Sequence, residues 1–146
     1  PPRRFDMTVR VERVFEFAAP PEAVWEFIAD PERRARSISV VEEYEVTGAD
    51  TATWHVRLPI PRMNRTIAVE TEELRHDEPR YVKFIGRSKA MRVQGEHTLE
   101  PNDGGTRLTN RFVVDGKIPG VERYFKKQLD GELENLEAAI RRDLDL

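Results

Sequence analysis

The C-terminal segment has the helical periodicity that most constrains how this chain can fold. Across residues 121–146, apolar side chains recur at steps of three or four and form one stripe along a long helix. Charged residues between them, including Glu132, are expected to keep the opposite face in water. Because the rest of the chain offers mainly alternating strands as an apolar partner, we expect this helix to pack on a curved antiparallel sheet. Such an arrangement can hold a cavity between helix and sheet.

The preceding segments predict one strand, two short helices and six further strands. The first strand covers residues 8–18, where Arg13 falls on the apolar face and indicates a bulge or a buried ion pair. A short helix is expected to open at Pro20-Pro21, and a second at Pro31, with Asp30 as its cap and an end near Ser37. The period then becomes two, and strands are predicted at residues 40–47, 53–58, 65–74, 80–86, 91–100 and 106–114.

Composition limits the classes of protein that this chain can represent. Its 146 residues predict a single domain at 7–146, and residues 1–6 are interpreted as a disordered extension or an expression remnant. The net charge of −3 is too small to indicate binding to nucleic acid or to an anionic membrane. No apolar run reaches the roughly 18–20 residues of a membrane span, and no signal peptide is recognisable, so a cytoplasmic location is expected. Without cysteine, the chain can form neither a disulfide nor a thiolate site.

Two stretches of the sequence resemble a known superfamily. The first comprises Phe15-Glu16-Phe17-Ala18-Ala19-Pro20-Pro21-Glu22-Ala23-Val24-Trp25 and Ile28-Ala29-Asp30-Pro31-Glu32, and the second comprises Leu99-Glu100-Pro101 and Gly104-Gly105-Thr106-Arg107-Leu108-Thr109. They resemble the START-like, or Bet v 1-like (SRPBCC), helix-grip superfamily, and within it the polyketide cyclase/dehydrase group or the CoxG-like group associated with carbon monoxide dehydrogenase. CoxG-like proteins often carry a further C-terminal region that attaches to membrane. This chain ends with its helix, so stable membrane insertion is not expected.

The resemblance implies an α+β helix-grip fold. A curved seven-stranded antiparallel sheet would wrap around the long C-terminal helix, two short helices would follow the first strand, and a hydrophobic cavity would open near the start of the last helix. Alternation and helical spacing give the candidate ligand-binding residues Tyr44, Trp54, Val56, Ile67, Phe84, Met91, Val93, His97, Asn110, Phe112, Phe125, Gln128 and Leu129. The alternative is that these side chains fill one another's gaps and form a solid core.

Among these candidates, His97 has the side chain best suited to catalysis or to a specific hydrogen bond with a ligand. It shares a strand face with Met91, Val93 and Leu99. A buried neutral imidazole there could position a ligand oxygen or act as a general base, so His97 is the one tentative catalytic residue. The simpler interpretation, which we favour, is a core histidine bonded to a neighbouring carbonyl.

Other reactive groups give weaker signals. His55 and His76 are expected to face solvent, and the three histidines have no metal-ligand spacing, so neither a metal nor another cofactor is predicted. Most carboxylates on the predicted strands, including Glu73, are assigned to the solvent face. The basic cluster of Arg33, Arg34 and Arg36 is interpreted as a solvated surface.

Loops at the expected cavity mouth carry three apolar residues, Ile60, Met63 and Ile118. They could form a lid, contact a protein partner or a second copy of the chain, or pack back on the rim.

The leading functional hypothesis is a protein that binds or transports a small hydrophobic molecule, which the resemblance suggests is lipid, quinone-like or polyketide-like. Apolar burial would supply the affinity, and His97, Gln128, Tyr44 or Asn110 would orient the ligand. One alternative is a polyketide cyclase/dehydrase-type enzyme that uses His97 in the same cavity. The other is an assembly factor that binds a partner protein through the mouth loops.

Overall fold

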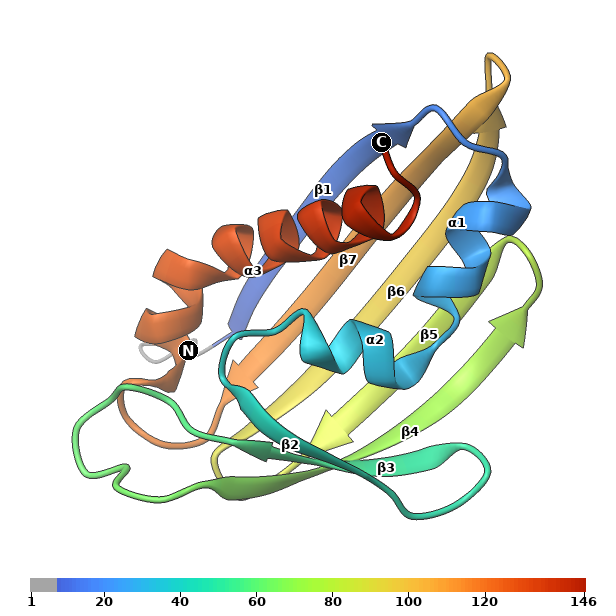
Figure 1. Ribbon diagram of the computed structural model, residues 1–146. Helices are drawn as coiled ribbons and strands as arrows, with labels where there is room; N and C mark the ends of the chain where they lie inside the picture. The colour runs from blue at the N-terminus through green and yellow to red at the C-terminus, as the bar shows by residue number, and fades with distance from the viewer. Residues whose placement is uncertain (1–7) are drawn as a thin grey trace, which may run out of the picture.

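Alternating apolar and polar residues build one seven-stranded antiparallel sheet, which curves around the C-terminal helix (Figure 1). The computed structural model describes residues 8–146, so the prediction for residues 1–6 lies outside the described part. The strands are β1 (Thr8–Phe17), β2 (Val41–Val46), β3 (Thr51–Val56), β4 (Ile67–Asp77), β5 (Tyr81–Arg87), β6 (Met91–Asn102) and β7 (Gly105–Gly116). Their order in the sheet is β1-β7-β6-β5-β4-β3-β2, so strands β2 to β7 each pair with their sequence neighbour. The predicted helix-grip fold is confirmed.

Three helices lie on the concave face of this sheet: α1 (Pro21–Ile28), α2 (Pro31–Arg36) and α3 (Val121–Asp143) (Figure 1). Both short helices begin with proline, whose missing N–H is not needed in a first turn. The carboxylate of Asp30 caps α2, because its Oδ1 accepts from the amide of Glu32 at 3.0 Å. Both predicted helix starts are therefore confirmed. In the described range, no helix is both long enough and apolar enough to cross a membrane.

The apolar stripe of α3 faces the sheet as its spacing predicts. Val121, Phe125, Leu129, Leu133, Leu136 and Ile140 are all buried. The helix ends at Asp143, three residues before the predicted end, and Leu144 occupies its C-cap. One expectation about the polar face is wrong: Glu132 is buried, because it faces the segment between α2 and β2 rather than water.

The largest differences in strand bounds occur next to turns. β3 covers Thr51–Val56 rather than residues 53–58, because the turn that follows β2 is tight: the amide of Thr47 donates to the carbonyl of Thr51 at 3.0 Å. Leu58 leaves the strand just before Pro59 but remains in the core. β4 begins two residues later than predicted and extends three further. Arg13 forms no bulge; its guanidinium pairs with Asp130 on α3 at 3.3 Å and remains partly exposed.

Gly95 on β6 leaves room for the aromatic side chains beneath α3. It occupies an inward position between Val93 and His97, and a Cβ at this position would lie 2.6 Å from Cζ of Phe84 and 3.0 Å from Cε1 of Phe112. Two rings cannot move aside together without disturbing the core. We expect Gly95→Ala to lower the free energy of unfolding by about 1–3 kcal/mol, measured by urea denaturation. Gly131→Ala on α3 is the control, because nothing lies within 4 Å of a Cβ there; equal stability of the two variants would contradict the packing argument.

Candidate ligand-binding site

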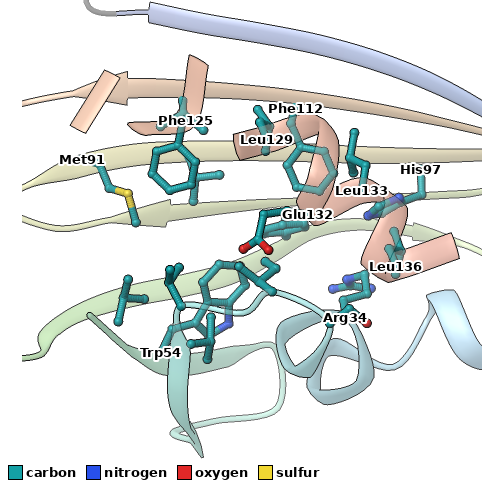
Figure 2. A pocket seen from close by; sticks show the side chains of 18 residues that line it. Arg34, Trp54, Met91, His97, Phe112, Phe125, Leu129, Glu132, Leu133 and Leu136 are labelled. Atoms are coloured by element: carbon teal, nitrogen blue, oxygen red, sulfur yellow. The ribbon is translucent and has the colours of Figure 1, made fainter. Parts of the chain in front are cut away.

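A cavity lies between the sheet, α3 and the segment that joins α2 to β2 (Figure 2). Every strand from β3 to β7 except β4 contributes to its wall. The lining residues are Arg34, Ser37, Ile38, Val40, Val41, Trp54, Val56, Phe84, Met91, Val93, His97, Phe112, Val114, Phe125, Leu129, Glu132, Leu133 and Leu136. Ser37, Ile38 and Val41 are only partly buried, so the α2–β2 segment (residues 37–40) and the first residue of β2 form the side of the cavity closest to solvent.

The cavity is narrow. Its volume is about 40 Å³, whereas pockets that hold drug-sized ligands usually measure about 300–1,000 Å³. The structure is therefore close to the alternative stated above, in which the inward side chains fill one another's gaps and leave little free volume. A molecule larger than a few atoms can enter only if part of the wall moves. Residues 37–40 belong to no helix or strand, so they are the part of the wall whose movement would disrupt the least regular secondary structure.

His97 lies at one end of this cavity, with no solvent exposure. Its Nδ1 is 2.7 Å from Oδ1 of Asn110, and its ring is flanked by those of Phe84 and Phe112, whose centroids lie at 6.4 and 5.6 Å. Nε2 has no hydrogen-bond partner among the described residues. Burial first, and then the positive charge of Arg34, lower the pKa of His97 to about 3, and the bond to Asn110 opposes both effects only in part. The imidazole is therefore neutral at physiological pH.

Arg34 forms the polar wall next to His97 (Figure 2). Its side chain is 5% exposed, so the interpretation of this arginine as part of a solvated cluster is wrong. The guanidinium donates to the carbonyl oxygen of Ile28 at 2.6 Å and to Oε2 of Glu73 at 2.5 Å, and it lies 5.1 Å from the centre of the Phe84 ring. These contacts tie α2 to both α1 and β4. Arg36, on the same short helix, is the exposed member of the cluster.

Glu73 is also turned inward, which corrects its assignment to the solvent face. It has the same alternation as Ile67, Val69 and Thr71, so the burial of its side chain follows the pleat of β4. The register between β4 and β5 shifts immediately after it. Consecutive glutamates at 72 and 73 must point to opposite faces of a strand, and this was the available signal for the inward carboxylate.

Glu132 of α3 holds a second part of the cavity wall, the α2–β2 segment, in place. Its two carboxylate oxygens accept from the amide of Ser39 at 3.2 and 3.0 Å, and Oε1 also accepts from Nδ2 of Asn135. A carboxylate on α3 thus holds the α2–β2 segment against the helix. Tyr124, two turns earlier, is half-buried beside the same segment, and burial raises the pKa of its hydroxyl. The helical spacing alone did not single out Glu132, because its partner is a backbone amide 93 residues away.

Comparison with known families agrees with this geometry. A family described as polyketide cyclase / dehydrase and lipid transport matches residues 8–141, almost the whole chain. The chain belongs to this family. The predicted resemblance is therefore confirmed, although the family covers both catalysts and carriers. Among curated protein sequences, no match was found.

Several solved structures share the fold of this protein. A conserved protein from Geobacillus kaustophilus is 19% identical, with a TM-score of 0.76 over 94% of this chain and 95% of that one. A START superfamily protein from Mycobacterium smegmatis is 15% identical, with a TM-score of 0.73 over 93% and 97%. The Zhui aromatase/cyclase from Streptomyces sp. R1128 is 21% identical, with a TM-score of 0.59 over 93% and 86%. At these identities, the likeness concerns the fold alone.

The fold of this protein brings most of the predicted site residues together. The predicted residues that line the cavity are Trp54, Val56, Phe84, Met91, Val93, His97, Phe112, Phe125 and Leu129. Asn110 lies behind His97 instead of in the wall, because its amide is engaged with the imidazole and with the carbonyl of Arg13. Tyr44 and Ile67 are half-buried near the sheet edge and do not reach the cavity. Gln128 is exposed, because it precedes Leu129 by one residue and so lies about 100° away around the helix.

The three apolar loop residues pack back on the rim. Ile60, Met63 and Ile118 are half-buried against the core, and a Cβ at Gly120 would lie 3.5 Å from Cβ of Ile60. The amide of Leu58 donates to the sulfur of Met63 at 3.1 Å. These contacts place the loop residues against the core next to the start of α3, where the opening was expected. The partly exposed wall lies instead at residues 37–41.

The other two histidines do not line the cavity. His76 is exposed and its ring packs on that of Trp25, whereas His55 lies 3.4 Å from Glu45 on the outer side of β3 and is partly exposed. Within residues 8–146, no group of three or more histidine, aspartate or glutamate side chains is arranged to hold a metal ion.

Proposed function

We propose that this protein binds a small hydrophobic molecule (lipid, quinone-like or polyketide-like) in the cavity between the sheet and α3. The observation that carries the proposal is an apolar cavity lined in part by His97, whose buried Nε2 has no hydrogen-bond partner among the described residues. Apolar burial supplies affinity, and a single unsatisfied polar atom supplies orientation. Membership in a family that includes lipid transport supports the same conclusion.

Entry of such a molecule requires the α2–β2 segment to move away from α3. Two side-chain contacts hold this segment: Arg34 anchors α2, which precedes it, to β4, and Glu132 anchors Ser39 within it to α3. The sheet below remains continuous, because its ladder does not depend on these bonds. The protein would therefore open on one side only, and its closed state would be the narrow cavity described above.

His97 supports binding more than catalysis. A general base works best when its pKa lies near the working pH. A pKa of about 3 leaves His97 unprotonated at neutral pH but makes it a weak base. Its bond to Asn110 holds the ring in one orientation, which suits a group that positions a ligand.

Filling the cavity is expected to abolish binding. Val93→Phe adds a ring at a lining position, and we expect it to weaken the binding of naphthalene, an apolar probe followed by NMR titration, at least about tenfold, since the added volume exceeds the space available. Val14→Phe is the matched control, because Val14 is 47% exposed on β1 and the substitution is the same. Thermal unfolding of both variants shows that they are folded.

Two results would contradict the proposal. In the first, naphthalene binds Val93→Phe as well as it binds the unmodified protein. In the second, an organic extract of the purified protein contains no small molecule by mass spectrometry and the unmodified protein binds no naphthalene.

A further inference from the structure

The polar end of the cavity defines what kind of group it can accept. Figure 2 shows His97, Arg34 and Leu136 at one end and Met91 and Phe125 at the other. A molecule in this cavity would therefore meet apolar side chains along most of its length, the carboxylate of Glu132 near the middle, and Arg34 and His97 at one end. The direction of the hydrogen bond available at that end, donated or accepted, follows from the bonds that the surrounding side chains already make.

Three of the polar side chains at this cavity are already engaged within the protein. Arg34 donates to the carbonyl of Ile28 and to Glu73, the hydroxyl of Ser37 donates to the carbonyl of Arg33 at 2.9 Å, and the oxygens of Glu132 accept from Ser39 and Asn135. In residues 8–146, two buried side-chain atoms have no hydrogen-bond partner: Oε1 of Glu73, which does not line this cavity, and Nε2 of His97, which belongs to a lining residue.

The tautomer of His97 follows from Asn110. Nδ2 of Asn110 donates to the carbonyl oxygen of Arg13 at 3.2 Å, and the reverse orientation of the amide would place two acceptors against each other. Oδ1 of Asn110 therefore faces Nδ1 of His97 at 2.7 Å, and since Oδ1 only accepts, Nδ1 must carry the proton. A neutral imidazole has one proton, so Nε2 carries a lone pair. Burial and the charge of Arg34, which lower the pKa of His97, exclude the doubly protonated form at neutral pH.

We propose that the molecule bound in this cavity carries a hydroxyl group, phenolic or alcoholic, that donates a hydrogen bond to Nε2 of His97. This inference rests on the proposed function and adds the polarity of the ligand group. The rings of Phe84 and Phe112 flank the imidazole, and the ring centroids of Trp54 and Phe84 lie 5.7 Å apart. A flat aromatic ligand therefore fits between these aromatic walls. A phenol combines both features. An ether or a ketone at the same place would set an acceptor against an acceptor.

The test compares three probes of nearly equal shape: naphthalene, 2-naphthol and 2-methoxynaphthalene. We expect 2-naphthol to bind at least about tenfold more tightly than its methyl ether, because only the phenol satisfies the buried nitrogen. In His97→Phe, which keeps a ring but removes the acceptor, this preference should fall to about onefold. In the unmodified protein, ¹⁵N NMR of the imidazole should show a protonated Nδ1 and a bare Nε2 whose signal shifts when 2-naphthol is added.

Each contrary outcome has a distinct meaning. A proton found on Nε2 in the free protein overturns the assignment of the acceptor without any variant. Equal affinity for the phenol and the ether overturns the hydroxyl preference but leaves hydrophobic binding in place. If none of the three probes binds and the organic extract of the purified protein contains no small molecule, the proposed function fails, and the hydroxyl preference fails with it.

Discussion

Replacement of Arg34 by alanine is expected to lower the free energy of unfolding by about 3–5 kcal/mol. The guanidinium is 5% exposed and its partner Glu73 is nearly as buried, so removal of the arginine leaves a carboxylate in the interior without its counter-ion. The carbonyl of Ile28 would lose its donor as well. One oxygen of Glu73 already has no partner among the described residues, which increases the cost of leaving the other one unpaired. Urea denaturation followed by circular dichroism measures the change.

The same helix provides the control for this prediction. Arg36→Ala removes an equal charge from a side chain that is 70% exposed and paired with Glu32, so we expect a change within about 0.5 kcal/mol. The double variant Arg34→Met with Glu73→Leu should recover most of the loss, because it removes both charges and keeps the volume. A cost below about 1 kcal/mol for Arg34→Ala would show that the ion pair is not buried in solution.

Loss of stability on acidification is the second large effect, and His97 is its cause. Because the folded protein holds the pKa of His97 at about 3, below the value of 6.5 for an unperturbed histidine, the unfolded chain binds more protons between these two values. The contribution of His97 to stability is therefore complete above pH 6.5 and decreases as the pH falls. Between pH 7 and pH 4, the linkage amounts to about 3 kcal/mol.

A variant without the imidazole separates this effect from the titration of carboxylates. His97→Phe should show a shallower pH dependence, and the difference between the two stability curves should grow as the pH falls from 7 to 4. Urea denaturation at several pH values gives both curves. An NMR titration in which the ring of His97 protonates near pH 6.5 in the folded protein would contradict the expectation, as would two parallel curves.

Local periodicity was sufficient to predict the architecture. The stripe from Val121 to Ile140 required a sheet to pack on, and alternation along the strands identified the inward faces that carry Trp54, Phe84 and Phe112. These patterns are local because burial of an apolar face is decided by residues two, three or four positions apart. For the same reason, most of the apolar lining of the cavity was predictable from the sequence.

The polar part of the site was not predictable in the same way. Arg34 lies within a run of arginines and Glu132 within a run of acids, and nothing in these runs distinguishes the buried member from its exposed neighbours. Each is buried because a partner from another element meets it: Glu73 of β4 for the arginine, and the amide of Ser39 for the glutamate. Burial of a charge depends on such a partner, and the partner is brought close only by the fold.

The order of apolar and polar residues alone determined that this chain forms a curved sheet with a helix lying across it, because the gain from removing apolar surface from water depends on which side chains share a face. Only the tertiary structure decided which face of α2 points inward, how narrow the interior is, and which nitrogen of His97 is left with a lone pair. Those features depend on hydrogen bonds between residues far apart in the chain, and their geometry exists only after the elements have packed together.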